Sequence, residues 1–308
     1  MSASVMPRGL LDIESLTRAE IEAILTRSKD FQPAPGQSFK RFDILRGRSV
    51  VNLFFEASTR TRTSFEMAAK RLGADTVSIT ASGSSVSKGE SLVDTLNTLA
   101  AMRPDAIVMR HSASGAPHFL SRYLPIPIVN AGDGTHEHPT QALLDARTIL
   151  DRRGTLEGLR VAIIGDIAHS RVARSNIFLL SKFGVQVVLC GPAPLLPREM
   201  GEIASGVELT CDMETAIRAA DVIMMLRVQL ERQHSSPFPA SEYFQFFGLR
   251  PEHVELARPD VVVMHPGPIN RGREISSEVA DSQRSAILNQ VENGVAVRMA
   301  VLERVLAA

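Results

Sequence analysis

Apolar and polar positions alternate along the chain in blocks. Continuous apolar runs of strand length, typical of strands buried on both faces of a parallel sheet, alternate with segments whose apolar residues recur at helical spacing. After an opening helix within residues 13–31, with Thr17 as its predicted N-cap, the first half predicts strands at 48–56, 75–79, 106–110 and 127–131. The helices predicted to follow them lie at 61–73, 90–102, 115–123 and 138–150. This rhythm indicates a parallel sheet with helices on both faces.

The segment DRRGTLEG, residues 151–158, interrupts this rhythm with charge and glycine, and a second series follows. Its predicted strands lie at 159–166, 185–192, 221–226 and 259–267, and its helices at 170–184 and 213–220, before a final amphipathic helix at 290–306. We therefore predict an α/β chain of two doubly wound parallel-sheet domains, with a hinge near 150–155 and a cleft between them. Ligands of such sheets collect at the carboxyl ends of the strands.

Length and charge support this division and narrow the choice of ligand. The chain has 308 residues, more than one compact core usually holds, and its 34 basic and 34 acidic side chains give zero formal net charge. A nucleic-acid or anionic-membrane partner needs a clear basic excess, so we expect neither. Any basic cluster should therefore act locally, on a small anion.

Several other classes of protein are disfavoured by what the sequence lacks. The two cysteines, Cys190 and Cys211, cannot form a disulfide framework, and we interpret Cys190 as a buried small hydrophobe. The eight histidines lack the paired spacing of a zinc site, so no metal is predicted. No N-terminal stretch resembles a signal peptide and no apolar run reaches the roughly 18 residues that span a bilayer, so we expect a cytoplasmic protein.

One cluster of cations and hydroxyls stands directly after a predicted strand. In FFEASTRTRTSF, the residues Ser58, Thr59, Arg60 and Thr61 lie where that strand gives way to a helix. First-turn N–H groups lack intrahelical partners and the helix dipole is positive there, so a guanidinium and hydroxyls at this point favour a phosphate site. A solvated basic helix face is the alternative, and by itself this cluster does not decide between them.

Further candidates follow other strands. Arg110 ends the strand at 106–110, and His138 and Gln141, three apart and beside Pro139, open the helix at 138–150. In the second half, Arg171 and Arg227 follow strands, with Gln229 just beyond, and HPGPINRG (265–272) is a rigid turn whose carbonyls can accept hydrogen bonds. An arginine after a buried strand is common, so none of these is decisive alone.

Together these segments resemble the aspartate and ornithine carbamoyltransferases over essentially the full length. The resemblance rests on STRTR, SSVSKGES, MRH, HPTQALLD, GDIAHSRVARS, LRVQLER and HPGPINRG, which occur in the family's order. It implies carbamoyl transfer from carbamoyl phosphate, without a cofactor, to the α-amino group of an amino acid. It also accounts for the two histidines of HEHP, His136 and His138, without a metal.

The resemblance implies a role for each candidate. It assigns binding of the phosphate to Ser58, Thr59, Arg60 and Thr61. It assigns binding of the carbamoyl group to Arg110, which also contacts the phosphate, to His138 and Gln141, and to the carbonyl-bearing turn at Gly267 and Pro268. It assigns binding of aspartate to Lys88, Arg171, Arg227 and Gln229, and it matches Ser84 and Lys88 to a loop that reaches a neighbouring subunit's site. The residues implied in catalysis are Arg60, Thr61, Lys88, Arg110 and His138.

The family also implies an organisation. We expect a carbamoyl phosphate-binding domain at 1–150 that includes a C-terminal helix at about 288–308, and an L-aspartate-binding domain at 151–287. A loop shared with a neighbour implies a homotrimer. The sequence leaves open whether regulatory chains or a dihydroorotase-like partner join it.

Aspartate is favoured over ornithine because a dicarboxylate needs cations, and Arg171, Arg227 and Lys88 are available. An ornithine site would need an acidic partner for the side-chain ammonium. A dinucleotide-dependent dehydrogenase built on VAIIGD (161–166) is a weaker alternative, since no G-x-G-x-x-G follows. A non-catalytic phosphate-binding or assembly subunit is a third reading.

Overall fold

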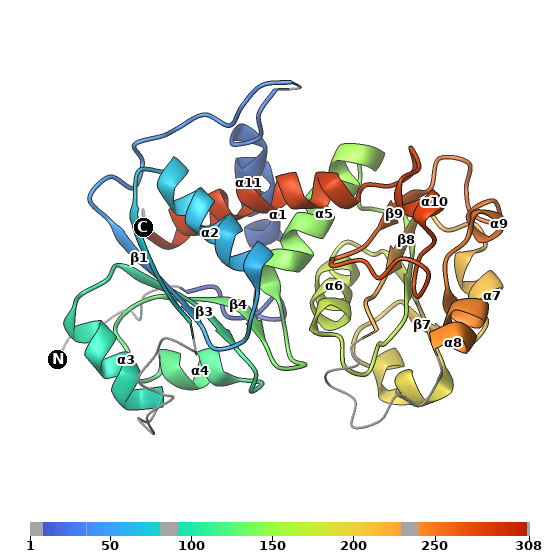
Figure 1. The fold of residues 1–308 in the computed structure, drawn as a ribbon, viewed down its shortest axis with the longest axis horizontal. Helices are drawn as coiled ribbons and strands as arrows, with labels where there is room; N and C mark the ends of the chain where they lie inside the picture. The colour runs from blue at the N-terminus through green and yellow to red at the C-terminus, as the bar shows by residue number, and fades with distance from the viewer. Residues whose placement is uncertain (1–8, 35, 81–91, 229–239, 307–308) are drawn as a thin grey trace. The chain divides into compact units, whose positions relative to one another are not determined.

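The computed structural model describes residues 9–34, 36–80, 92–228 and 240–306. The chain forms two compact units (Figure 1). Unit 1 comprises Met1–Leu143 together with Glu292–Ala308, and unit 2 comprises Leu144–Val291. Within the described residues, no helix is both long and apolar enough to span a bilayer.

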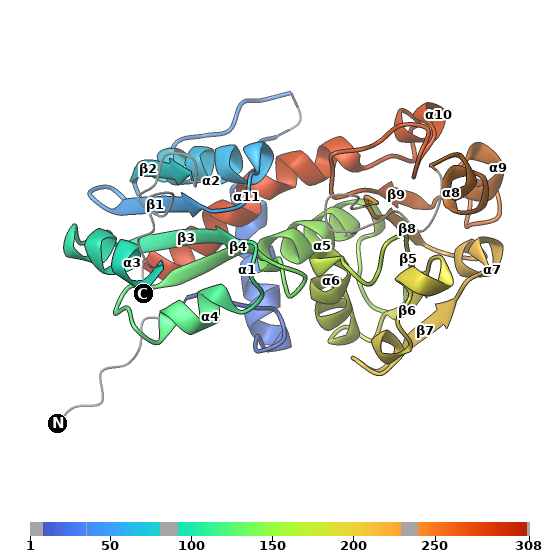
Figure 2. The same ribbon diagram turned by 60° about the horizontal axis from the view of Figure 1, so that its bottom comes forward.

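Unit 1 contains a four-stranded parallel sheet of order β2-β1-β3-β4. Its strands are β1 (Ser49–Phe54), β2 (Asp75–Thr80), β3 (Ala106–His111) and β4 (Ile128–Asp133). The helices α2 (Thr59–Arg71), α3 (Leu92–Ala101) and α4 (Ala116–Ser121) connect them. Leu53, Ile107 and Met109 pack with α3 and α4 in one buried cluster, and Figure 2 shows α2 on the opposite face from α4. Both faces are covered, which explains the continuous apolar runs of β1 and β3.

The last helix, α11 (Ile287–Leu306), joins unit 1 through its C-terminal part. Arg27 of α1 (Arg18–Asp30) donates to both carboxylate oxygens of Glu303, at 2.6 and 2.8 Å, and Arg304 donates to Glu20 at 2.6 Å. Thr17 caps α1 through a reciprocal capping box with Glu20. The structure thus confirms the predicted cap and the predicted packing of the C-terminal helix on the first domain.

Unit 2 contains a five-stranded parallel sheet of order β7-β6-β5-β8-β9. Its strands are β5 (Arg160–Ile164), β6 (Gln186–Cys190), β7 (Val207–Thr210), β8 (Val222–Met225) and β9 (Val262–Met264). Its helices are α6 (Arg171–Ser181), α7 (Met213–Ile217), α8 (Ala240–Phe247), α9 (Pro251–Val254) and α10 (Ser277–Ala280), with 3₁₀ turns at Ala193–Leu195 and Arg198–Gly201. The predicted class of two doubly wound parallel sheets is confirmed.

The sequence pattern did not predict β7 or the short helices α8, α9 and α10. Strand β7 is an edge strand of four residues, VELT, and all of them are partly or fully exposed. Such a strand lacks the continuous apolar run that marked its buried neighbours, because neither face of it is fully covered.

Helix α5 (Pro139–Arg153) runs through the point at which the chain passes from one unit to the other. The division falls between Leu143 and Leu144, whereas the sequence suggested a hinge near 150–155. Beyond that division, the buried Asp145 accepts hydrogen bonds from Asn176 of α6 and from Gln290, at 2.9 and 2.7 Å. The helical periodicity of α5 continues across the division, although the residues on its two sides belong to different units. The sequence pattern therefore could not locate the division between the units.

The packing of α11 gives a direct stability test. Leu302 is fully buried in this helix, whereas Leu288 at its start is 83% exposed. We expect Leu302→Ala to lower the free energy of unfolding by about 2–5 kcal/mol, since it removes buried methyl groups and leaves a cavity. The matched control Leu288→Ala should change it by no more than about 0.5 kcal/mol. Urea denaturation followed by circular dichroism measures both, and equal effects would contradict the packing of α11.

Candidate functional site

In unit 1, the candidate residues lie at the point where the strand order reverses. The chain runs from β1 outward to β2, then crosses back to β3 on the other side of β1 and continues to β4. At such a switch point the connections leave the sheet in opposite directions, which opens a crevice at the carboxyl ends of the two adjacent strands. Ser58–Thr61 follow β1, and Arg110 lies at the end of β3.

The N-terminus of α2 has features that suit an anion. Ser58 is its N-cap with extended backbone, but its hydroxyl makes no capping hydrogen bond, and the first turn contains no acidic residue. First-turn N–H groups and the positive end of the dipole are therefore not neutralised by the helix's own side chains. Thr59 and Arg60 are exposed, while Thr61 is buried. This combination favours the anion site over a merely solvated helix face.

Arg110 is fixed between the ends of β1 and β4. Its guanidinium donates to Glu56 Oε1 at 2.6 Å and to the Ala131 carbonyl at 3.3 Å, and only 12% of its side chain is exposed. The Phe55 N–H donates to the Arg110 carbonyl at 2.9 Å, which joins the segment before α2 to the end of β3. The structure thus joins Arg110 to residues 55 and 56, which precede the Ser58–Thr61 segment.

His138 and Gln141 lie at the start of α5, and both are at least nine-tenths buried. His138 immediately precedes Pro139, and its carbonyl accepts from the Gln141 N–H at 2.9 Å. The neighbouring Glu137 is completely buried and accepts hydrogen bonds from the Ile13 and Glu14 N–H groups, at 2.9 and 3.3 Å. A buried carboxylate bound to backbone donors holds this turn in place, and His138 with it.

In unit 2, the strand order reverses between β5 and β8. Arg171, which is 4% exposed, is the first residue of α6 after β5, and the Ser170 hydroxyl caps that helix by accepting from the Ala173 N–H at 3.1 Å. Arg227 follows β8, and the preceding Leu226 N–H donates to Ile164 at the end of β5 at 2.8 Å. Both arginines therefore belong to the switch point of this sheet.

The turn at Gly267 and Pro268 follows β9 and is fixed by buried polar groups. The Gly267 N–H donates to His265 Nδ1 at 2.8 Å, and His265 Nε2 lies 3.2 Å from Glu274, with both side chains fully buried. Glu274 also accepts from the Asn270 N–H at 2.6 Å. Gly267 has a φ of 62°, a left-handed conformation that favours glycine.

Three predicted residues, Ser84, Lys88 and Gln229, lie outside the described residues. Other residues with evident roles were not predicted. Glu56, two positions before Ser58, positions Arg110, and Glu274 positions the turn at Gly267. Glu56 was visible in the sequence beside the cationic cluster, but no spacing rule pairs it with an arginine 54 positions away.

The cysteines do not offer a nucleophile at these positions. Cys190 is fully buried at the end of β6, and burial raises its pKa to about 12, so its thiol stays protonated at neutral pH. This confirms the interpretation of Cys190 as a small hydrophobe. Cys211 is exposed and lies just after β7, the edge strand of its sheet.

Comparison with known proteins finds matches over nearly the whole chain. Residues 8–151 match the family model of the aspartate/ornithine carbamoyltransferase carbamoyl-P binding domain, and residues 157–305 match that of the Asp/Orn binding domain. The chain is 78% identical to an aspartate carbamoyltransferase catalytic subunit of Solibacter usitatus, over 98% of this chain and all of that protein.

Solved structures of carbamoyltransferases have closely similar folds. An aspartate transcarbamoylase from Trypanosoma cruzi in complex with N-(phosphonacetyl)-L-aspartic acid has a TM-score of 0.89 at 33% identity, with 99% of this chain and 97% of that one covered. An ornithine carbamoyltransferase from Pyrococcus furiosus has a TM-score of 0.87 at 30% identity, with 99% of both chains covered. The chain belongs to the aspartate/ornithine carbamoyltransferase family.

Proposed function

We propose that unit 1 binds carbamoyl phosphate, that unit 2 supplies the groups that bind L-aspartate, and that the candidate residues described above form the active site. The reaction is the transfer of the carbamoyl group to the α-amino group of L-aspartate, which gives N-carbamoyl-L-aspartate and phosphate and is an early step of pyrimidine biosynthesis. The observation that carries the site assignment is the position of Ser58–Thr61 and Arg110 at the switch point of the first sheet.

The phosphate site follows from the N-terminus of α2. Backbone N–H groups of the first turn, the hydroxyls of Ser58, Thr59 and Thr61, and the Arg60 guanidinium supply donors to the phosphate oxygens. A planar guanidinium binds two phosphate oxygens at once, which a lysine ammonium cannot do with the same geometry. Arg110, held by Glu56 between the ends of β1 and β4, adds a second guanidinium at the same edge of the sheet.

The chemical step needs position and electrostatics rather than a protein nucleophile. The neutral amine of aspartate attacks the carbonyl carbon of carbamoyl phosphate, the carbonyl oxygen gains negative charge, and the C–O bond to the phosphate then breaks. The departing phosphate takes up the proton that the amine releases. Arg110, Thr61 and His138 stabilise the charge on the carbonyl oxygen, while Gln141 and the turn at Gly267 and Pro268 hold the carbamoyl amide.

The choice of aspartate follows from charge. Arg171 and Arg227 stand at the switch point of the second sheet, and two carboxylates of a substrate match two guanidinium groups. Curated relatives support this choice: the chain is 55% identical to an aspartate carbamoyltransferase catalytic subunit of Syntrophotalea carbinolica, over 96% of this chain and 94% of that one. Lys88 and Gln229 complete the aspartate site in this proposal.

The proposal extends to assembly and location. Ser84 and Lys88 act in the active site of a neighbouring chain, so that the working form is a homotrimer in the cytoplasm. It requires no metal or cofactor for the chemical step.

A substrate panel tests the function. The pure protein is incubated with carbamoyl phosphate and either L-aspartate or L-ornithine, and the carbamoylated amino acid is quantified. We expect turnover with aspartate and none above background with ornithine, because an ornithine ammonium would face two guanidinium groups. Turnover with ornithine, or binding of carbamoyl phosphate with no product, would overturn the proposal.

Arg60 can be tested against a neighbour on the same helix. Arg60→Lys keeps the charge but loses the two-pronged contact with phosphate, so we expect kcat/KM to fall by at least about 10²-fold. In the control Arg62→Lys, a lysine can keep the long 3.8 Å ion pair that Arg62 makes with Glu66, and kcat/KM should remain within about twofold. Steady-state kinetics measures both, and an active Arg60→Lys enzyme would remove the phosphate site from α2.

The shared active site can be tested by mixing two inactive variants. Lys88→Ala and Arg60→Ala chains are each expected to form inactive homotrimers. In mixed trimers, some sites receive both an intact Arg60 from one chain and an intact Lys88 from its neighbour, so part of the activity should return. Mixing after mild dissociation, followed by assay, measures this recovery, and hybrids without activity would rule out the shared site.

A further inference from the structure

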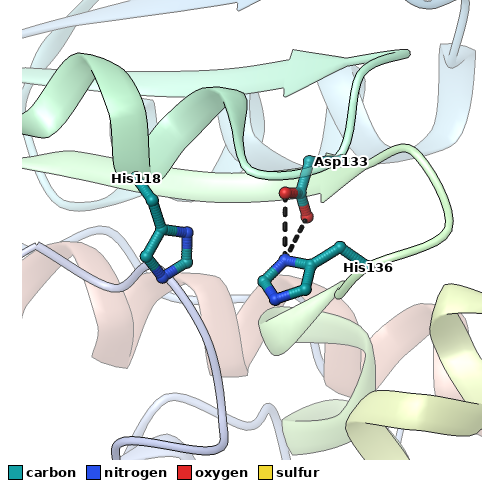
Figure 3. Close-up of side chains that lie close together, drawn as sticks. All are labelled: His118, Asp133 and His136. Atoms are coloured by element: carbon teal, nitrogen blue, oxygen red, sulfur yellow. Dashed lines mark hydrogen bonds and ion pairs between the residues drawn. The ribbon is translucent and has the colours of Figure 1, made fainter.

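Two histidines and an aspartate converge beside the turn that leads to His138. His118 lies on α4, Asp133 is the last residue of β4, and His136 lies in the turn that follows (Figure 3). One ligand-type atom from each of the three lies within 4.8 Å of the others, which makes this the one group of its kind among the described residues. Imidazole nitrogens and carboxylate oxygens are the ligands that Zn²⁺ prefers.

The Asp12 carboxylate contacts the ring of His118 and fixes its orientation. The His118 Nε2 lies 2.6 Å from Asp12 Oδ2, and the Ser15 N–H donates to Asp12 Oδ1 at 2.7 Å, which holds that carboxylate in place. With Nε2 donating to this carboxylate, the tautomer that can bind a metal ion presents its lone pair at Nδ1. This arrangement is the one by which proteins orient metal-binding histidines.

The remaining nitrogen of His118 is directed at the other two residues. Figure 3 shows Nδ1 on the side of the ring that faces Asp133 and His136. This atom is inaccessible to solvent and has no hydrogen-bond partner within the described part of the chain. A buried imidazole nitrogen with no partner is costly unless something binds to it, which distinguishes this group from an ordinary hydrogen-bonded cluster.

Asp133 and His136 are joined by a hydrogen bond that is slightly shorter than the separation of two ligands of one ion, and a bound ion would replace the proton between them. His136 Nδ1 lies 3.0 Å from Asp133 Oδ2, whereas zinc bonds of about 2.0–2.2 Å place neighbouring tetrahedral ligands about 3.3–3.5 Å apart. Asp133 is held in position because it also accepts from the Gly115 N–H and from Asn130, at 2.7 and 2.8 Å. Because the three ligand atoms are up to 4.8 Å apart, coordination would require His118, on the short helix α4, to move closer to this pair.

The local charge favours a cation. Asp12 contacts His118 and Asp133 contacts His136, while Glu137 is the next residue along the chain, and Asp133 and Glu137 are completely buried. Fixed negative charges in a poorly hydrated site attract a divalent cation more strongly than the same charges in water. Both histidine side chains are one-third exposed, so an ion can enter from solvent.

We propose that His118, Asp133 and His136 form a binding site for Zn²⁺ or a related transition-metal ion, oriented by Asp12 and distinct from the residues assigned to carbamoyl transfer. Two imidazoles and one carboxylate select this class of ion over Mg²⁺ or Ca²⁺, which prefer oxygen ligands alone. Three protein ligands leave the fourth position to water. A bound ion would link α4 to the turn that ends at His138, and would therefore stiffen that turn.

The chain contains a matched control for this site in unit 2. His169 and Asp166 form a pair of the same kind, with the histidine three residues after a buried aspartate, 2.8 Å between Nδ1 and Oδ1, and the same side-chain exposures of 33% and 0%. Neither residue belongs to a ligand group of three among the described residues. A histidine–aspartate pair is therefore present in both units, but within the described residues a second imidazole completes a group of three only beside His136.

The test uses the full-length, untagged protein after removal of metal by a chelator. Co²⁺ is titrated in and followed by visible absorption, since four-coordinate Co²⁺ absorbs much more strongly than the hydrated ion, and Zn²⁺ is then added as competitor. We expect one Co²⁺ per chain, displaced by Zn²⁺, with the band lost in His118→Asn and in His136→Asn. The control His169→Asn should retain it.

A second variant separates ion binding from loss of folding. Asp12→Asn leaves the three ligands intact and should weaken Zn²⁺ binding by about 10–100-fold without changing the stoichiometry, as measured by calorimetry. Circular dichroism of every variant confirms that it is folded. The proposal is overturned if the wild type takes up no stoichiometric Co²⁺, or if folded His136→Asn binds as well as wild type. An unchanged affinity in Asp12→Asn would remove Asp12 from the site.

Discussion

Parallel pairing of the strands is the constraint on which the other features of this protein depend. Because the strands of each sheet run in one direction, every strand ends at the same edge, and the segments that follow are gathered there whatever their distance in sequence. In unit 1 this brings residues 56 and 110 into direct contact, and in unit 2 it joins residue 164 to residue 226. The reversal of strand order then determines which two strand ends stand at the switch point of each sheet.

The edge of the sheet in unit 1 is held by buried polar groups as well as by apolar packing. Glu137, Asp133 and Asn130 are completely buried, and each accepts a hydrogen bond from a backbone N–H group, at residues 13, 115 and 132 respectively. A buried polar group that loses its hydrogen-bond partner is destabilising, so conformations that break this network are disfavoured. The network therefore holds the turn in a single conformation. The same carboxylates that hold His138 in place also give this region the negative charge on which the proposed metal site depends.

Acidic side chains are distributed unevenly along this edge of the sheet in unit 1. On the side of α2, the first turn has no acidic residue, which suits a phosphate. On the side of α4, the carboxylates Asp12 and Asp133 border two imidazoles, which suits a metal cation. A zero formal net charge for the chain is compatible with both, because the separation of charge is local.

The sequence by itself determined the order of the main strands and helices, the N-cap at Thr17, and the residue types that stand at the strand ends. These follow from local rules, since periodicity, capping and turn chemistry act over a few neighbouring residues. The family resemblance supplied roles for those residues, and for Arg110 the structure adds the contact with Glu56 that places it. The edge strand β7, the short helices of unit 2 and the division inside α5 were not determined locally, because each depends on packing partners from elsewhere in the chain.

Only the tertiary structure decided which distant polar groups meet. His118 is separated from Asp133 and His136 in sequence by most of a strand and its flanking turns, so a search for closely spaced histidines does not find the group. The parallel pairing of β3 and β4 brings α4 beside the end of β4, and the three residues meet there. The same holds for Glu56 with Arg110, and for His265 with Glu274. The physical reason is that periodicity reports which face of an element is buried, while contacts between elements depend on how the strands pair.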